Sequence, residues 1–122
     1  MTFETVEQYQ RWADETLSLQ QAMFPPPACP AWCGLPNGHS YDRVEHDGEM
    51  TRHHNSAPEA FAAVWDVEQN RHGEIGGEVF GIEISAECIK SESELTSDQA
   101  RALASELVAA ADLLDEITGV QR

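Results

Sequence analysis

The chain has 122 residues, which suits one domain with a modest core, and its hydrophobic share of 41% excludes a disordered protein. It holds 22 acidic residues against 7 basic ones, a formal net charge of −15. Binding to a phosphate backbone needs clusters of Lys and Arg, and the basic residues here are scattered, so the charge argues against nucleic acid and anionic membranes as partners. Two interpretations remain: a solvated acidic surface, or an acidic face that docks on a basic partner.

No run of about 18 apolar residues is present, so no membrane-spanning segment is expected. The first residues lack the basic and apolar regions of a signal peptide. We therefore expect a cytoplasmic protein, in which thiols stay reduced.

The first predicted element is a helix from about Thr5 to Met23. Thr5 and Gln8 have the spacing of a capping box. Apolar residues recur at helical spacing on one face: Val6, Tyr9, Trp12, Ala13 and Leu17. The three prolines at positions 25–27 end the helix, because proline cannot continue a helix interior.

The segment from Pro25 to about Ser40 is predicted to be an irregular loop, since it is rich in Pro, Gly and Asn. A long irregular loop in a small domain is unusual unless something fixes it. This loop contains Cys29 and Cys33, followed by His39. The spacing therefore indicates a ligand that ties the loop down.

A hairpin is expected after the loop, because Asp47-Gly48 is a typical two-residue hairpin turn. Its strands would be Tyr41–His46 and Glu49–His54. With two residues in the loop, Val44 would lie opposite Thr51.

The same register indicates which later histidine lies near the cysteine loop. Tyr41 would face His54, and because side chains alternate between the two faces of a strand, both would share a face with His39. His53 would fall on the opposite face with Asp42. A one-residue slip in register would exchange the two histidines.

Two further strands are predicted. The third, near Phe61–Gln69, would turn one apolar set inward: Ala63, Trp65 and Val67. The sequence "HGEIGG" is expected to be a turn in which His72 is exposed. The fourth strand would place one set on a common face by its period of two: Phe80, Ile82, Ile84, Ala86 and Cys88.

The last predicted element is a helix from about Ser97 to Thr118. Thr96 and Gln99 form a second capping-box pattern, and Gly119 is a natural C-terminal stop. Its apolar stripe is continuous: Leu103, Leu107, Val108, Ala111, Leu114 and Ile117.

These elements predict an α+β fold with a small, mostly antiparallel sheet of about four strands. The C-terminal helix would pack on the sheet, and the N-terminal helix would cover another part of the core or form a homodimer. We expect one domain over residues 1–122, in four parts: the helix 1–24, the metal loop and hairpin 25–56, the strands 57–95 and the helix 96–119.

The candidate metal site combines thiol and imidazole donors, which suit zinc: Cys29, Cys33, His39 and His54. Other interpretations stay open, namely unligated thiols, a disulfide between the two cysteines, or an iron–sulfur cluster. Four protein ligands would make zinc a structural staple. Three ligands and a water, with Asp42 or Glu45 as base, would make it catalytic. Trp32, between the cysteines, would cover the site or act as a recognition side chain.

The motif "CPAWC", followed by "GHS" and "RHHNSAP", resembles a small family of actinobacteria and their phages. Its members carry Cys-Pro-x-Trp-Cys, spaced histidines and a C-terminal helix. The resemblance covers roughly Cys29 to Ile117 and suggests an actinobacterial or actinophage origin. The family's pattern of a histidine two residues before Ser or Gly matches His54. Because the family is a domain of unknown function, the resemblance implies no activity.

We expect a non-enzymatic, zinc-stapled interaction or regulatory protein that binds the basic surface of another protein. The closed ligand set supports this, as does the lack of motifs such as H-E-x-x-H, G-x-S-x-G or a P-loop. The alternatives are a small zinc-dependent hydrolase-like enzyme and a nucleic-acid-binding zinc module.

Overall fold

The structure is a computed structural model that describes residues 2–85 and 94–120. Two helices and four strands follow in the order α1 (Val6–Met23), β1 (Arg43–Val44), β2 (Met50–Asn55), β3 (Ala62–Arg71), β4 (Glu74–Ile84) and α3 (Ser97–Thr118). The strands form one antiparallel sheet in the order β1-β2-β3-β4. The predicted α+β class is therefore confirmed.

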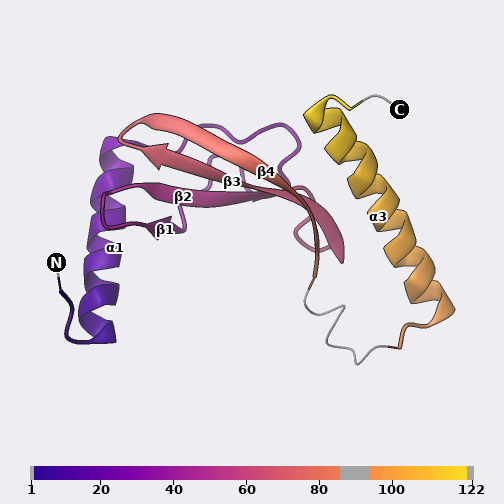
Figure 1. The fold of residues 1–122 in the computed structure, drawn as a ribbon, viewed down its shortest axis with the longest axis horizontal. Helices are drawn as coiled ribbons and strands as arrows, with labels where there is room; N and C mark the ends of the chain where they lie inside the picture. The colour runs from indigo at the N-terminus through magenta and orange to yellow at the C-terminus, as the bar shows by residue number, and fades with distance from the viewer. Residues whose placement is uncertain (1, 86–93, 121–122) are drawn as a thin grey trace.

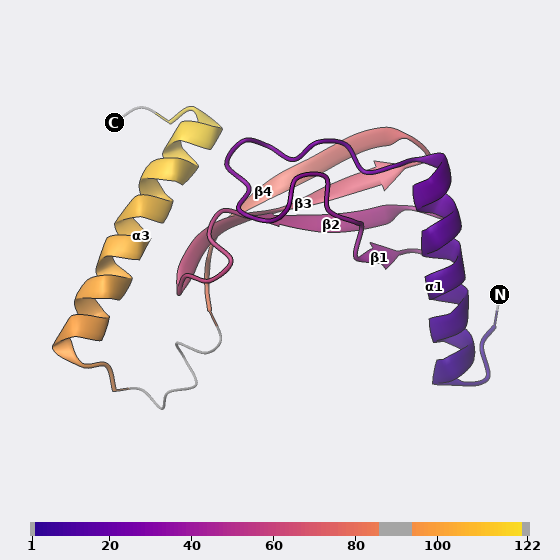
Figure 2. The ribbon, with the colours of Figure 1, turned by 180° about the vertical axis from the view of Figure 1, so that it is seen from behind.

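The two helices lie at opposite ends of the sheet (Figure 1). α1 contacts β1 at one end, and α3 contacts β3 and β4 at the other. The loop between α1 and β1 crosses one face of the sheet, which is the near face in Figure 2. Among the described residues, no helix is long and apolar enough to cross a membrane.

α1 begins as predicted, but only half of the expected capping box forms. The Thr5 side chain accepts the backbone N–H of Gln8 at 3.1 Å, whereas the Gln8 side chain accepts from Glu4. The apolar stripe is also only partly buried, because Val6 is 78% exposed. Its middle packs on a small core of Tyr41, Val44 and Met50, through Trp12, Ala13 and Leu17.

The register of the first hairpin differs from the prediction by one residue. Val44 pairs with Met50, not with Thr51. Gly48 has a φ of +87° and donates its N–H to the carbonyl of Glu45, which leaves three residues in the loop instead of two. A glycine with positive φ at the third position is typical of a type I turn followed by a bulge, a loop that an Asp-Gly sequence also permits.

β3 buries the face opposite to the predicted one. Trp65 and Val67 are only half-buried. The even-numbered residues of β3, whose side chains lie on the opposite face, are buried along most of the strand: Ala62, Val64, Glu68 and Asn70. Ala63 is buried as well, near the end of the strand that α3 approaches. Hydrophobic periodicity points to the wrong face because the inward face carries polar side chains that bond to one another.

The turn before β4 is shorter than predicted. His72 and Gly73 form it with φ values of 52° and 93°, as in a type I′ hairpin turn, and His72 is exposed as expected. The rest of "HGEIGG" belongs to β4, which begins at Glu74. The predicted positions Ala86 and Cys88 lie outside the described residues.

α3 has both predicted caps. The Thr96 and Gln99 capping box is complete, and Gly119 closes the helix in the left-handed conformation. Within α3, all of which the structure describes, only Ala110 is fully buried. Glu106 anchors the helix to β3, since its Oε2 accepts the backbone N–H groups of Phe61 at 2.7 Å and Ala62 at 3.3 Å.

Two adjacent glycines of β4 test how closely β3 and β4 approach each other. A Cβ at Gly77 would lie 2.6 Å from the carbonyl oxygen of Val67, whereas a Cβ at Gly76 would meet nothing within 4 Å. We expect Gly77→Ala to lower the free energy of unfolding by about 1–3 kcal/mol, because the strands must move apart. The control Gly76→Ala should change it by less than about 1 kcal/mol. Urea denaturation followed by circular dichroism measures both, and equal losses would contradict the close approach.

Candidate metal centre

Two cysteines and two histidines meet between the α1–β1 loop and β2. One ligand atom from each lies within 4.8 Å of all the others: Cys29, Cys33, His39 and His54. A tetrahedral zinc ion with metal–ligand bonds of about 2.0–2.3 Å sets its ligand atoms about 3.3–3.8 Å apart. The cluster is therefore close to the size of such a site and could hold a metal ion. These four residues are the ones that the sequence analysis names as ligands.

The loop folds back on itself to present Cys29. The backbone N–H of Cys29 bonds to the Asn37 side chain at 2.8 Å, and Gly38 donates its own N–H to the Cys29 sulfur at 3.2 Å. Cys33 and His39 each close a turn, and the Cys33 sulfur lies 3.9 Å from Nε2 of His39. A backbone N–H aimed at a sulfur supports the negative charge of a metal-bound thiolate.

Gly34 ties this loop to the end of β2. Its N–H donates to the carbonyl of Asn55 at 2.8 Å. A Cβ at this position would lie 2.8 Å from the Ser56 carbonyl oxygen and 2.9 Å from Cδ of Pro58. Because Gly34 follows Cys33 directly, and Asn55 follows His54, this close contact brings Cys33 and His54 together.

His54 has the environment of a metal ligand. Its Nε2 lies 3.0 Å from Oε1 of Glu68, while its Nδ1 is buried with no hydrogen-bond partner among the described residues. A buried polar atom left unpaired costs about 1–3 kcal/mol. Metal-binding histidines commonly donate their second nitrogen to a carboxylate, as His54 can to Glu68. A metal at the cluster would supply the partner that Nδ1 lacks.

His53 lies outside the cluster. It is on the other face of β2, where its ring stacks on Trp65 and its Nδ1 is 3.5 Å from Asp42. The sequence predicts that a one-residue slip of the hairpin register would put His53, and not His54, on the face of the cluster. The register does slip by one residue, but His54 still lies on that face. The reason is that β2 is six residues long and pairs with β3 along its whole length, with His54 opposite Asp66. β1 has only two residues and does not decide which face of β2 is buried.

A buried ion pair lies beneath the cluster, and the sequence analysis did not find it. Arg52 is 0% exposed and donates two hydrogen bonds, of 2.9 and 3.0 Å, to the carboxylate of Glu68. Two more of its N–H groups donate to the carbonyl oxygens of Pro27 and His39, both at 2.8 Å. Arg52 therefore holds the metal loop near both of its ends. The sequence did contain one signal for Arg52: it lies two residues before His54 in β2, so both side chains must lie on the same face of the strand.

Glu68 is the centre of this polar network. It also accepts a hydrogen bond of 3.0 Å from the Tyr41 hydroxyl. Burial by itself raises the pKa of the Glu68 carboxyl, but hydrogen bonds from Arg52, His54 and Tyr41 outweigh it and hold this pKa below its ordinary value. For Tyr41, burial is the largest effect and raises the pKa of the phenol, so the hydroxyl remains a donor.

Trp32 packs over the cluster. Its ring meets the ring of His54 edge to face, with 6.1 Å between the centroids, and its side chain is partly buried. This contact favours the covering role over the role of an exposed recognition side chain.

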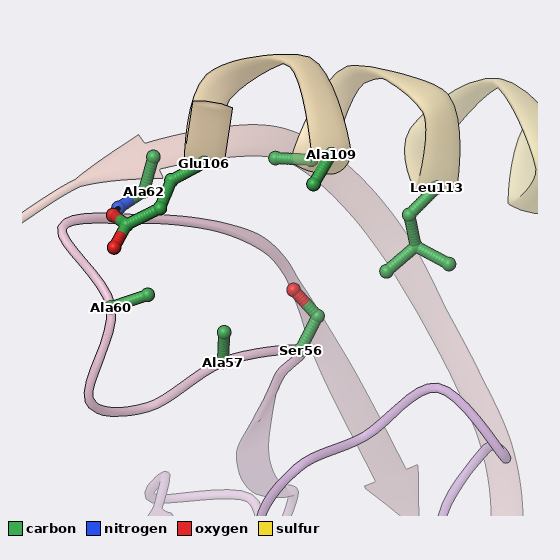
Figure 3. Close-up of a pocket in the computed structure, with 8 residues that line it drawn as sticks. Ser56, Ala57, Ala60, Ala62, Glu106, Ala109 and Leu113 are labelled. Carbon is green, nitrogen blue, oxygen red and sulfur yellow. Dashed lines mark hydrogen bonds between the residues drawn. The ribbon is translucent and has the colours of Figure 1, made fainter. Parts of the chain in front are cut away.

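The acids named as candidate catalytic bases are not part of the cluster. Asp42 lies beside His53, and Glu45 forms an exposed ion pair with Arg43 at 2.9 Å. A separate hollow of about 230 Å³ lies between α3 and the segment 56–62 (Figure 3). Glu106 is the one titratable side chain among its described lining residues, which are otherwise alanines, Ser56 and Leu113. Its Oε2 already accepts the two backbone N–H groups that anchor α3.

Comparisons with protein-family models, with curated proteins and with solved structures give no match. The resemblance to the actinobacterial family therefore stays a prediction.

The buried ion pair can be compared with an exposed one. We expect Glu68→Gln to lower the free energy of unfolding by about 3–5 kcal/mol, because it leaves the charge of Arg52 buried without a counter-ion. Glu45→Gln breaks only the exposed pair with Arg43 and should cost less than about 1 kcal/mol. Urea unfolding of both variants measures the difference. Equally small losses would show that the Arg52–Glu68 pair does not hold the loop.

The two adjacent histidines give a matched test of the ligand set. His54→Ala should weaken metal binding more than about 100-fold, since it removes a ligand and not only a supporting group. His53→Ala should leave binding unchanged. Metal analysis of the purified proteins and titration against a chromophoric chelator provide the measurement. Loss of metal from the His53 variant alone would mean that the ligand set is wrong.

Proposed function

We propose that the cluster is a structural zinc centre, and that the protein is a non-enzymatic, acidic interaction module whose partner presents a basic surface. The observation that carries the structural role is the closed donor set. One ligand atom from each of four residues lies within 4.8 Å of the others, and the buried carboxylate of Glu68 bonds to one of them, His54. A tetrahedral ion held by all four would have no coordination position left for an activated water.

The donor chemistry favours zinc over the other interpretations of the cysteines. Two thiolates and two imidazoles form a common tetrahedral zinc set. Cys29 and Cys33 are free thiols, which argues against the disulfide. An iron–sulfur cluster usually needs four cysteines, and the chain has three.

A metal staple suits the small core of this fold. The buried hydrophobic residues among those described are few and mostly small or medium: Tyr41, Val44, Met50, Ala62, Ala63, Val64 and Ala110. Zinc binding contributes directly to folding in small domains whose sites do not exist in the unfolded chain. Here the ion would join the irregular loop 25–42 to β2, in addition to the contact that Tyr41 makes in the small core.

The charge distribution supports a basic partner. Most of the described arginines lie within ion-pair distance of a carboxylate of the same chain: Arg43, Arg52, Arg71 and Arg101. The excess of carboxylates that gives the net charge of −15 therefore has no matching cations within the chain. Such a surface speeds association with basic partners and repels nucleic acid. The cytoplasm of a bacterium or of a phage-infected host is the setting we propose.

Cobalt substitution separates the structural centre from a hydrolase-like one. We expect the cobalt(II) protein to show the intense visible absorption of a tetrahedral ion, with thiolate charge-transfer bands that disappear when both cysteines are changed to serine. Because the shell is closed, added azide should leave the spectrum unchanged. A weak five-coordinate spectrum, or one that azide shifts, would indicate an open position and favour the zinc-dependent hydrolase-like alternative.

A further inference from the structure

We propose that the outer edge of β4, which pairs with no further strand among the described residues, is a docking site for an extended basic segment of a partner protein, which adds to the sheet as a further strand. The inference rests on the proposed function, and it names the surface that is used and the shape of the partner.

β4 is a long strand at the border of the sheet. The strand order makes β1 and β4 the two edges, and β1 has only two residues whereas β4 has eleven. Figure 1 shows β4 along the upper border of the sheet, with α3 beyond its end. Among the described strands, β4 pairs with β3 alone, and residues 74–78 are all exposed. An edge of this length is a template for another strand.

Backbone donors on this edge point away from β3. Ser85 donates its N–H to the Phe61 carbonyl at 2.7 Å, and the next pair along the ladder is Ala62 with Ile84. Hydrogen-bonded and non-hydrogen-bonded pairs alternate in an antiparallel ladder. The N–H groups of Ile84 and Ile82 are therefore turned outward, where an added strand could accept them.

The two sides of β4 differ in chemistry. Three glutamates of β4 lie on one face of the sheet, because each pairs with an odd-numbered residue of β3 and alternate residues of a strand share a face. These glutamates are Glu74, Glu78 and Glu83, and their partners are Arg71, Val67 and Ala63. The pairing shifts by one residue between Trp65 and Asp66, so even-numbered residues of β4 before the shift and odd-numbered residues after it lie on the same face. On the other face lie three isoleucines, which pair with even-numbered residues of β3: Ile75, Ile82 and Ile84. Ile75 is 50% exposed and Ile84 is 43% exposed.

This pattern selects one kind of occupant. A strand with alternating basic and apolar side chains would place its cations opposite the glutamates and its apolar side chains beside the isoleucines, and such cross-strand pairs stabilise a sheet. A second copy of the chain is disfavoured. Antiparallel pairing of two β4 edges would bring both glutamate rows to one face and join two chains that each carry a net charge of −15.

Three synthetic peptides test strand addition on the full-length, metal-loaded protein. The first alternates lysine and valine over about nine residues, which nearly spans β4. The second has the same composition with all lysines before all valines, and the third is the first with N-methyl groups on alternate amides. We expect fluorescence anisotropy to show at least about tenfold tighter binding of the first, since only it offers both the side-chain pattern and the backbone ladder.

The outcomes separate this inference from the proposed function. Equal, salt-sensitive binding of all three peptides would overturn docking at the edge while leaving an acidic surface that binds basic partners. Failure of all three to bind would overturn both.

A charge-matched pair of variants locates the surface. Changing Glu74, Glu78 and Glu83 to glutamine should weaken binding of the alternating peptide by about tenfold. The control removes three exposed charges elsewhere, as E15Q, D112N and E116Q, and should weaken binding by less than about threefold. Equal losses would overturn the assignment to β4.

A second copy as the occupant is tested by sedimentation equilibrium of the free protein. We expect no dimer that depends on the β4 edge. Ile84→Pro removes an outward N–H without touching the ladder to β3, and its cobalt spectrum reports whether it is folded. A dimer that this variant dissolves would assign the edge to a second copy and overturn the proposal.

Discussion

The buried pair of Arg52 and Glu68 is the interaction on which the other parts of this structure converge. A guanidinium with no exposure to solvent needs acceptors for its N–H groups. Here the acceptors are the Glu68 carboxylate and two backbone carbonyls of the metal loop. The carboxylate in turn bonds to Tyr41 of the small core and to His54 of the cluster. One ion pair thus connects the core, the loop and the Cys/His cluster, so loss of either charge would disturb all three.

This network explains how so open a fold can be held together. The helices sit at the two ends of the sheet and do not cover its faces as broad layers, so little apolar area is buried between them. Polar contacts then supply order that a larger core would otherwise provide, and a metal at the cluster would add to it. The same openness leaves the long edge of β4 without a neighbouring strand among the described residues, so one feature of the architecture underlies both the staple and the partner surface that we propose.

Local sequence signals predicted the local features well. Thr5, Thr96 and Gly119 mark helix ends because capping is decided within one turn of chain. Signals that depend on which residues face inward were less informative. The apolar set of Trp65 and Val67 indicated one face of β3, but the fold buries the other, where Glu68 and Asn70 are satisfied by partners distant in sequence. A buried charge pair cannot be found from periodicity, since each member alone has the pattern of a surface residue.

The sequence by itself pointed to three members of the cluster, because Cys29, Cys33 and His39 lie close together in a loop without regular structure. It also determined the order and type of the helices and strands. The choice of His54 over His53 was decided by tertiary structure. Side chains alternate strictly along a strand, so the two histidines must face opposite ways, but only the full pairing of β2 with β3, and the loop held over one face by Arg52, makes the face of His54 the buried one.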